Sequence, residues 1–516
     1  MTANHDDAMA PLVPPLASGR AQLLRALRTS VAAVADEWAA RSTAAKGWQR
    51  VPHALAEEWA SGPLPVARFL ARLAWSPPPV ASPPVAHTAA GLAVYAVPPI
   101  PRLGDGLAMR GYRAFIHAEP GNGLPAASPA VTPAVAGIAL VLGAGNVTAT
   151  PVLDVLDQVF VHHRAVVLKL SPLHQDLAAP LSQALAPLVA AHHLLVVTGS
   201  AELGARLAAH AAITAVHLTG SSDTWAALRA TPVLQTKHLS AEVGCCTPAF
   251  VLPGLWRDGE LRHVARQLAA FVAMNGGATC VAPRVLLTAA SWPQRAALLT
   301  HLQRELAALP ARVPFHGSVA EHFALATGLP VRALALAPTL CADRDERRHG
   351  DLCGRELFAP VLREFPRPGN EVVAFAHSAA QFVRERCFGA LSAYVFAPPR
   401  GLRTVTAAMA QLIDSLPHGT IAINTWTGLG YGLGTTPWGV PKHSDLAHGS
   451  GWTRNVSGLL HPHRVVIEAP FRPHPLPPWL PQHRRAAATM RALTLHTLRP
   501  SLRSLAVTAA NAMASF

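Results

Sequence analysis

The sequence has few charged residues, few lysines and no cluster of basic residues. Only 14% of its 516 residues are charged, and all but four of the 43 basic residues are arginines. The formal net charge of +14 would suit a polyanionic partner, yet there is no lysine–arginine run, no interleaved aromatic stripe and no nucleic-acid-binding motif. Charge without such a pattern is weak grounds for DNA or RNA binding, so we expect no nucleic-acid partner.

No segment has the continuous apolar length of a membrane-spanning helix. The residues between Glu119 and Asp154 are uncharged, but Pro125, Pro129, Pro133 and Pro151 interrupt them, and only VAGIALVLGAG (135–145) is continuously apolar. That is about the length of a buried strand. The N-terminus also lacks a basic segment followed by an apolar core, so it does not resemble a signal peptide. We therefore expect a cytoplasmic protein without a transmembrane segment.

Cysteine and histidine patterns typical of disulfides or metal sites are also missing. The six cysteines are Cys245, Cys246, Cys280, Cys341, Cys353 and Cys387. They form no CxxC pair and no regular framework, which fits a reducing cytoplasm. The histidine doublets at 162–163 and 192–193 have no cysteine or carboxylate at ligand-like spacing, so we predict no metal site. For Cys280 alone the alternatives are a small buried hydrophobe and a nucleophile. For adjacent Cys245 and Cys246 they are a redox pair and simple packing, and we favour packing.

Half of the residues are hydrophobic, which over this length suffices for at least two substantial cores. The spacing of apolar residues predicts helices over 20–46 and 64–75, ahead of the proline-rich segment 76–84. From about residue 135, short apolar segments alternate with helical ones, and a second alternating block begins near 247. This pattern predicts parallel sheets covered on both faces, with ligands at the carboxyl ends of the strands.

The segment VLGAGNVTA (141–149) begins like a dinucleotide-binding fingerprint. Gly143 and Gly145 follow a predicted strand and precede a predicted helix, but the third glycine is missing. The next strand ends in Lys169, where that fold would carry an acidic residue for the ribose. Either the turn is unrelated to nucleotide binding, or a nucleotide binds in another mode with the lysine reaching its ribose or phosphate.

Several motifs follow one another in a fixed order. They are GAGN with Asn146, VVLKLSP with Lys169, HLTGSSDTW with Gly220 and Ser221, AEVGCCTP with Glu242, NGGATC with Cys280, ELFAPV at 356–361 and GTIAINTW…TTPWG at 419–439. In this order the chain resembles the NAD(P)-dependent aldehyde dehydrogenase superfamily, in a less characterised bacterial branch with N-terminal and C-terminal extensions. The resemblance spans roughly residues 90–450.

The resemblance implies an α/β fold with two Rossmann-like parallel-sheet domains, a small oligomerisation element and a helical N-terminal region. The implied division is a helical region 1–90, an NAD(P)-binding domain 91–244 with part of the N-terminal helices, a catalytic domain 245–435, a return segment to the cofactor domain 436–470, and a proline-rich, basic amphipathic tail 471–516. It also implies a homodimer or homotetramer built by sheet extension. The tail helix would lie on a membrane or partner subunit, or pack onto its own chain, which we favour.

The resemblance assigns aldehyde oxidation to three residues. Cys280 would attack the aldehyde, because a thiolate forms a tetrahedral adduct readily and later leaves from a thioester. Asn146 and the Cys280 backbone N–H would stabilise the oxyanion. Glu242 would activate the water that releases a carboxylic acid. Gly276 and Gly277 would let the backbone approach substrate and cofactor without Cβ obstruction.

The cofactor, NAD or NADP, would occupy a second group of residues. Lys169 would hold the adenosine ribose, and Gly220 and Ser221 would place the pyrophosphate at a helix N-terminus. Glu356 would hold the nicotinamide ribose, with Phe358 beside the ring. These assignments come from the resemblance.

Some residues depart from the family pattern. Trp225 replaces the usual second glycine after the TGS turn, and Pro172 replaces the acidic residue that often selects NAD. Cys245 and Cys246 stand where glycine and lysine are common. Two alternatives follow: an acyl-CoA reductase, against which Glu242 argues because CoA-acylating relatives commonly lack it, and a catalytically degraded binding subunit, which Trp225 and the two cysteines favour.

Overall fold

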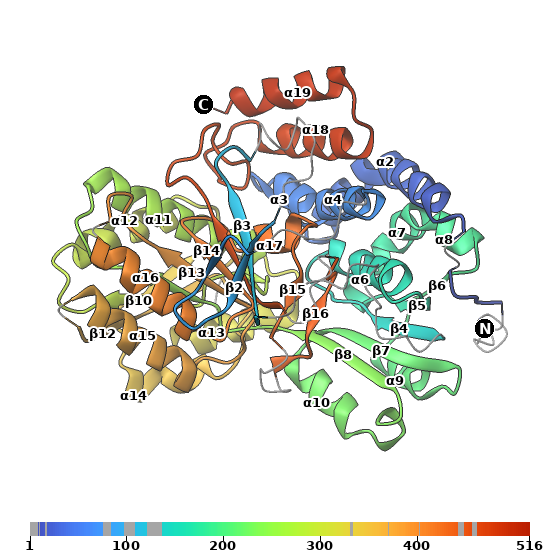
Figure 1. The fold of residues 1–516 in the computed structure, drawn as a ribbon, viewed down its shortest axis with the longest axis horizontal. Helices are drawn as coiled ribbons and strands as arrows, with labels where there is room; N and C mark the ends of the chain where they lie inside the picture. The colour runs from blue at the N-terminus through green and yellow to red at the C-terminus, as the bar shows by residue number, and fades with distance from the viewer. Residues whose placement is uncertain are drawn as a thin grey trace.

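The computed structural model describes residues 9, 11–15, 18–75, 84–97, 109–120, 137–330, 334–369, 371–401, 403–441, 448–456 and 462–515. Figure 1 shows two sheet-containing lobes side by side, with helices from both ends of the chain above them. Most of the proline-rich segment 76–84 lies outside the described residues. The predicted α/β class is confirmed, as is the helical N-terminal region.

The smaller lobe contains a five-stranded parallel sheet in the order β6-β5-β4-β7-β8. Its strands are β4 (Ile138–Leu142), β5 (Ala165–Lys169), β6 (Leu194–Val197), β7 (Ile213–Gly220) and β8 (His238–Val243). The connecting helices are α6 (Ala149–Phe160), α7 (Ala178–Ala184), α8 (Ala186–Ala190), α9 (Ala201–Ala209) and α10 (Ser222–Ala230). The chain first moves outward through β5 and β6, then returns to β7 beside β4. The strand order therefore reverses between β4 and β7, where open α/β sheets bind ligands.

Both faces of this sheet are buried, as the sequence predicts. Side chains of β5 alternate between the two faces, with Val166 and Leu168 in one core cluster and Val167 in another. The first cluster includes residues of α6, α7 and α8 and of the N-terminal helices, and the second includes residues of α9 and α10. Continuous apolar strands such as AVVLK are typical of this two-sided burial.

The larger lobe contains a ten-stranded sheet in the order β1-β2-β3-β17-β14-β13-β9-β10-β12-β11. Its strands are β1 (Ala86–His87), β2 (Ala93–Ala96), β3 (Arg113–Ala118), β17 (Pro462–Glu468), β14 (Thr420–Ile423), β13 (Ser392–Phe396), β9 (Pro248–Val251), β10 (Val285–Ala289), β12 (Val361–Arg367) and β11 (Thr339–Cys341). The seven strands from β17 to β11 are parallel, and β3 joins β17 antiparallel. The helices of this lobe are α11 (Asp258–Ala273), α12 (Arg295–Ala307), α13 (Gly317–Thr327), α14 (Glu346–His349), α15 (Val372–Arg386), α16 (Arg403–Ser415) and α17 (Gly428–Gly432).

Two of the expected domain boundaries differ from the sheets. Strands β2 and β3 fall within the expected cofactor domain 91–244, but they extend the sheet of the larger lobe. Within the expected return segment 436–470, Gly449 bridges to Glu242 of the smaller lobe, whereas β17 pairs with β14 and β3. These boundaries depend on which distant strands pair with one another. The local spacing of apolar residues does not predict that pairing.

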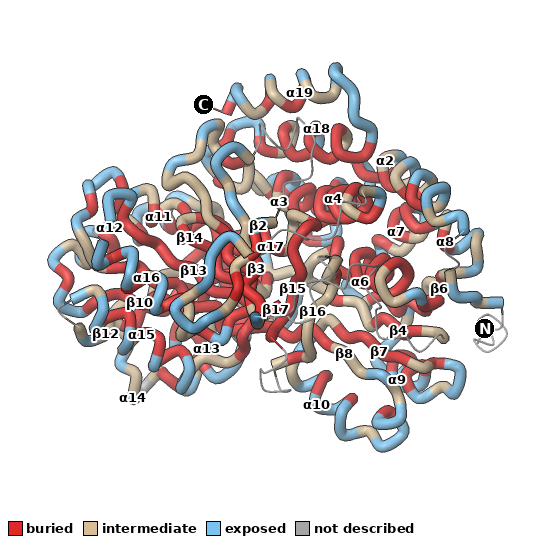
Figure 2. The backbone as a smooth tube through the Cα atoms, viewed as in Figure 1, coloured by how far each residue is buried: buried red, intermediate tan, exposed pale blue. Residues whose placement is uncertain are grey.

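The N-terminal and C-terminal helices pack on one another. They are α2 (Arg20–Ala45), α3 (Ala54–Ser61), α4 (Pro63–Ala74), α18 (Ala486–Leu498) and α19 (Leu502–Met513). Helix α18 contacts α2, α3 and α4, and buries Met490 and Leu493 against Trp59 and Leu64. Figure 2 shows α18 mostly buried, with α19 exposed above it. The apolar side of α18 therefore packs within its own chain, the alternative that we favour, and contact of the tail with a membrane stays a prediction. Among the described helices, none has the length and apolar character needed to cross a bilayer.

Candidate active site

Cys280 follows a tight turn at the end of α11. In the short helix η3 (Met274–Gly277), Asn275 and both glycines have positive φ angles of 54°, 61° and 77°. Glycine adopts this region freely, and asparagine tolerates it better than most residues. A Cβ on Gly277 would lie 2.3 Å from the backbone carbon of Ala359. The close approach that this glycine permits is therefore to the protein's own chain, and not to substrate or cofactor as expected.

Arg284 holds this turn from inside the protein. It is 1% exposed, and its guanidinium donates to the carbonyl oxygens of Gly277 and Ala359 and, at 3.3 Å, of Thr279. The cysteine turn is thereby tied to the segment that carries Glu356 and Phe358. The sequence analysis missed this residue, although a single arginine four positions after the cysteine, in an apolar stretch, is a usable signal.

Asn146 lies against the same turn. Its Nδ2 donates to the carbonyl oxygen of Ala278 at 3.2 Å, and Asn275 Nδ2 donates to the backbone oxygens of Asn146 and Ala278, both at 2.9 Å. These bonds join the loop after β4 to the turn before Cys280, although the two are more than 120 residues apart in sequence. A side-chain amide has two N–H donors, and the bond to Ala278 uses one of them.

The N-terminal helical region supports this arrangement. Lys46 Nζ donates to Glu58 Oε1 at 2.6 Å and to Asn275 Oδ1 at 2.7 Å. Lys46 and Glu58 are 7% and 1% exposed. Arg312 donates both Nη atoms to the carboxylate of Glu57 at 2.6 Å, and Glu57 accepts from the Asn275 backbone N–H. Sequence reasoning missed this contribution from residues 46–58, whose only signal is that Lys46 is one of four lysines.

Glu242 is the penultimate residue of β8 and lies in a buried polar environment. It is 8% exposed, and burial raises its pKa to about 7, with Asp154 adding to the rise and Trp438, Arg454 and His217 opposing it. His217 Nδ1 lies 2.8 Å from Ser240 Oγ, and its Nε2 lies 3.6 Å from Asp154. Glu242 therefore changes its charge near neutral pH, which suits a general base.

Glu356 contacts the segment that follows Glu242. Its Oε1 accepts from the backbone N–H of Cys245 at 3.3 Å, and a Cβ on Gly244 would lie 1.7 Å from its Oε2. Burial raises the pKa of Glu356 to about 7. Burial also raises the pKa of Cys280 well above its usual range, and the charges of Glu242 and Glu356 add to the rise. The structure thus brings the predicted nucleophile, the predicted base and Glu356 close enough to influence one another.

The residues expected to hold the adenosine ribose and the pyrophosphate lie at the carboxyl edge of the five-stranded sheet. Lys169 ends β5, is 6% exposed and has a pKa lowered by burial, with Glu202 opposing. Gly220 ends β7, and Ser221 caps α10 by accepting the Thr224 backbone N–H at 3.2 Å. Trp225 is buried in the core cluster beneath α10, so its bulk does not cover the exposed first turn of that helix.

Phe358 follows Glu356 on the segment held by Arg284. Its backbone N–H donates to His322 Nδ1 at 2.9 Å, and the Arg284 guanidinium lies 6.0 Å from its ring centroid. Glu242 and Glu356 therefore lie near enough to Cys280 to affect its charge, and Asn146 contacts the turn that precedes it, whereas Lys169 and Ser221 lie at the edge of the five-stranded sheet. The catalytic and cofactor roles of these residues remain predictions.

Comparisons with known proteins fit this geometry. Residues 151–320 match the model of the aldehyde dehydrogenase family. A search of curated proteins found no match.

Solved structures share the fold. The chain is similar to an NAD-dependent aldehyde dehydrogenase from Sinorhizobium meliloti (19% identity, TM-score 0.56, covering 86% of this chain and 80% of that one). It is also similar to an NADP-dependent enzyme from E. coli (18%, 0.59, 89% and 86%). A third is betaine aldehyde dehydrogenase from Staphylococcus aureus in complex with NAD+ (13%, 0.58, 89% and 84%). At these identities the likeness shows the fold alone.

Proposed function

We propose, taking the aldehyde dehydrogenase superfamily as the family of this chain, that the protein oxidises an aldehyde to a carboxylic acid with NAD or NADP. The observation that carries the proposal is the convergence of Cys280, Asn146 and Glu242 from three distant segments. A thiol, an amide and a carboxylate around one point are the groups that acyl-enzyme chemistry requires. The six free cysteines fit a reducing compartment, the cytoplasm, as the place of action.

In the proposed reaction the Cys280 sulfur attacks the aldehyde carbon and forms a thiohemiacetal. The pKa of the Cys280 thiol is raised, so its activation requires a base, and Glu242 is the neighbouring carboxylate with a pKa of about 7. NAD(P), held by Lys169, Ser221 and Glu356, would supply the acceptor for the hydride of the substrate carbon, and the product on Cys280 would be a thioester. Glu242 would release to solvent the proton taken from Cys280, and would then take a proton from the water that hydrolyses this thioester.

Asn146 stabilises the oxyanion of the thiohemiacetal in this scheme. Its Nδ2 already lies on the turn that carries Cys280, where it contacts the carbonyl of Ala278. Asn275, Lys46 and Arg284 fix that turn from behind, so the donor does not have to reorganise during the reaction. Preorganised donors of this kind are among the largest contributions to catalysis.

The residues at the carboxyl edge of the five-stranded sheet fit a dinucleotide. The first turn of α10 is exposed, and free N–H groups at a helix N-terminus favour the anionic pyrophosphate. Because Trp225 packs into the core, it does not prevent this pose. Lys169 would hold the adenosine ribose, and Glu356 and Phe358 would hold the nicotinamide end.

The test is turnover of aliphatic and aromatic aldehydes with NAD and with NADP, followed by the absorbance of the reduced nicotinamide. We expect Cys280→Ser to abolish turnover and Asn146→Ala to lower kcat by about 10²–10³. Cys341→Ser, which alters a buried cysteine at the far edge of the large sheet, is the matched control and should retain full activity.

Other outcomes would contradict the proposal. Unchanged turnover in Cys280→Ser would remove the covalent mechanism. Reduction of acyl-CoA with NADPH, without aldehyde oxidation, would favour the CoA-acylating alternative. Failure to bind either nucleotide at millimolar concentration, measured by tryptophan fluorescence, would favour a binding subunit without catalysis.

A further inference from the structure

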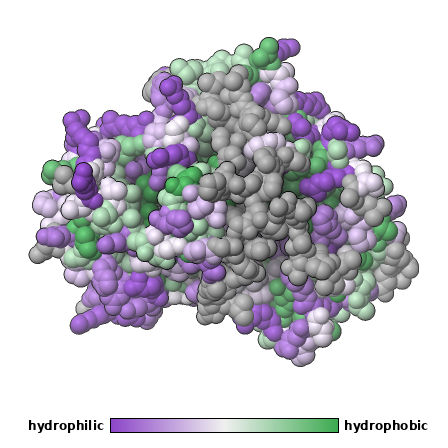
Figure 3. All heavy atoms as spheres, in the orientation of Figure 1, coloured by the Kyte–Doolittle hydropathy of each residue, from purple (hydrophilic) through white to green (hydrophobic). Residues whose placement is uncertain are grey.

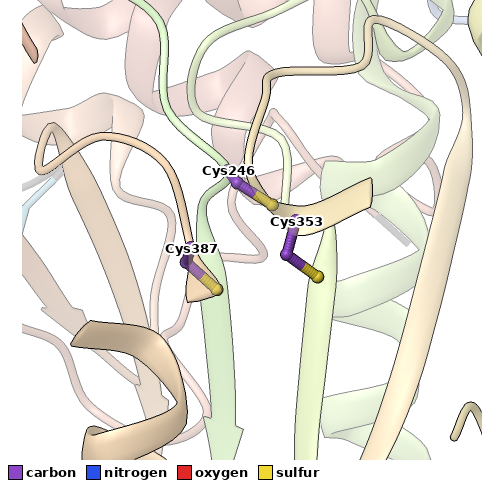
Figure 4. Close-up of side chains that lie close together, drawn as sticks. All are labelled: Cys246, Cys353 and Cys387. Atoms are coloured by element: carbon purple, nitrogen blue, oxygen red, sulfur yellow. The ribbon is translucent and has the colours of Figure 1, made fainter. Parts of the chain in front are cut away.

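Three cysteines distant in sequence converge behind the candidate active site. Cys246 precedes β9, Cys353 ends the short helix η4 (Gly350–Cys353), and Cys387 follows α15. Their sulfur atoms all lie within 4.8 Å of one another. Figure 4 shows the three side chains entering one space from three separate segments. We call these residues the cysteine cluster; Cys280 is not part of it.

Backbone hydrogen bonds hold the three segments in register. The Cys246 N–H donates to the carbonyl oxygen of Phe388 at 2.7 Å, and the Phe388 N–H donates to the carbonyl oxygen of Cys353 at 2.8 Å. Each cysteine is therefore fixed by the residue that follows Cys387. Because these bonds fix the backbone at the cluster, each sulfur can be adjusted toward a common ion by rotation of its own side chain alone.

A buried cation faces the cluster. Arg363 on β12 is 1% exposed, and its Nη2 donates to Cys246 Sγ at 3.8 Å, while its Nη1 has no hydrogen-bond partner among the described residues. A buried guanidinium requires a nearby anion, because desolvating an unpaired charge is costly. A thiolate of the cluster would be that anion.

We propose that Cys246, Cys353 and Cys387 bind one divalent thiophilic metal ion of the zinc class through three thiolates. The ion replaces the three thiol protons, which are released to solvent, and three metal–sulfur bonds form. Three thiolates and a divalent ion carry one net negative charge, which the Arg363 guanidinium neutralises. A monovalent ion would leave this buried site with one excess negative charge, so the charge balance favours a divalent one.

The spacing of the sulfurs suits this ion. A zinc–sulfur bond of about 2.3 Å places two sulfurs of one coordination sphere about 4 Å apart, within the separation of the cluster. Cysteine thiolates are the ligands that select zinc and related soft ions. Zinc prefers four ligands. Because Cys387 is only half-buried, a water molecule or another small ligand from solvent would fill the fourth position.

The surface beside Cys387 is hydrophilic. Arg384, Glu385 and Arg386 at the end of α15 are exposed, and Figure 3 shows hydrophilic side chains gathered over α14 and this end of α15. A metal ion can therefore approach from solvent. Bound there, it would link the segments that follow Glu242 and precede Glu356, because Cys246 and Cys353 lie four and three residues from these carboxylates.

The first experiment measures Cd²⁺ binding to the full chain with Cys280→Ala, which removes the active-site thiol as a competing ligand. Thiolate-to-cadmium absorption and calorimetry are followed under reductant, and zinc in the purified protein is measured by mass spectrometry. We expect one ion per chain. Changing a residue that only supports a metal ligand typically lowers metal affinity by roughly 10–100-fold. Cys246→Ser, Cys353→Ser and Cys387→Ser each remove a ligand atom, so each should weaken Cd²⁺ binding by at least that factor. Cys341→Ser is the matched control and should bind as tightly as its parent.

A second measurement does not depend on the folding of variants. The native protein is alkylated with and without Zn²⁺, and the modified cysteines are mapped. We expect Zn²⁺ to protect Cys387 but leave Cys280, which is also half-buried, equally reactive. The proposal would be overturned if the three variants bound Cd²⁺ as tightly as their parent, or if the Cys341→Ser control did not bind it. It would also be overturned if Zn²⁺ protected Cys280 alone, or if the unreduced protein contained a disulfide within the cluster.

Discussion

At the scale of the residue, two carboxyl groups change charge far from their usual pH. Glu242 and Glu356 both have a pKa raised to about 7, and burial is the first cause for each. Each also contributes to the raised pKa of Cys280. Three acidic groups confined in one buried region ionise reluctantly, because every new negative charge opposes the next. The geometry that suits catalysis therefore costs stability as the pH rises.

This coupling predicts a pH-dependent effect of Glu242→Gln. The unfolded carboxyl ionises near 4.5 and the folded one near 7, so the contribution to stability is complete below pH 4.5 and is lost as the pH rises to 7. Each pKa unit corresponds to about 1.4 kcal/mol, so the shift from 4.5 to about 7 sets an upper limit of about 3.5 kcal/mol. Urea denaturation should show Glu242→Gln gaining stability relative to the wild type at pH 8 and not at pH 4. An equal difference at both pH values would contradict the raised pKa.

At the scale of the element, the turn η3 is held by a helix of the N-terminal region. Lys46 lies between Glu58 of α3 and the side chain of Asn275, and its ammonium group also faces the rings of Trp48 and Phe315 at 5.5 Å and 5.0 Å. The N-terminal helices are thus part of the support of the cysteine turn. Their removal would affect both the fold and the geometry at Asn146.

Replacing Lys46 should separate these two effects. Lys46→Met leaves Glu58 buried without its cation, and breaking a buried ion pair costs about 3–5 kcal/mol. The double variant Lys46→Met with Glu58→Gln removes the unpaired charge and should recover much of this loss in urea denaturation. If the double variant instead lost as much free energy of unfolding as Lys46→Met and Glu58→Gln lose together as single variants, the pair would not be coupled. Because Asn275 loses its partner in both cases, aldehyde turnover should remain low in the double variant.

At the scale of the whole molecule, the C-terminal helices complete the N-terminal ones. Arg28 donates to the carbonyl oxygen of Leu498 at 2.6 Å, and Met490 and Leu493 pack against α3 and α4. The larger sheet likewise takes β3 from early in the chain and β17 from late in it. The two ends of the chain are therefore bound into one structure. The expected homodimer or homotetramer remains a prediction, which light scattering of the purified protein measures.

Truncation of the tail tests this arrangement. Ending the chain at residue 481 would expose the apolar surface of α3 and α4 that α18 covers, and we expect a lower Tm and aggregation. The intact protein should not sediment with anionic lipid vesicles, because the apolar side of α18 is buried. Vesicle binding that disappears in the truncated chain would instead support a membrane role for the tail.

The sequence by itself determined the classes of element and the order of the motifs. Apolar spacing is a local property, so the parallel strands β4, β5 and β7 and the helices α2, α4 and α18 could be predicted from it. The motifs around Asn146, Glu242 and Cys280 likewise carry their residue types and order in the chain. For this reason the α/β class and the residues of the candidate site could be named before the structure was known.

Only the tertiary structure decided which distant residues meet. Lys46 and Arg284 behind the cysteine turn, β3 and β17 in the larger sheet, and the meeting of Cys246, Cys353 and Cys387 all depend on contacts between segments far apart in sequence. A residue's spacing along the chain records the element it belongs to, but not the element it packs against. The cysteine cluster could not be predicted for that reason: its members share no local spacing, and only the folded backbone brings their sulfurs together.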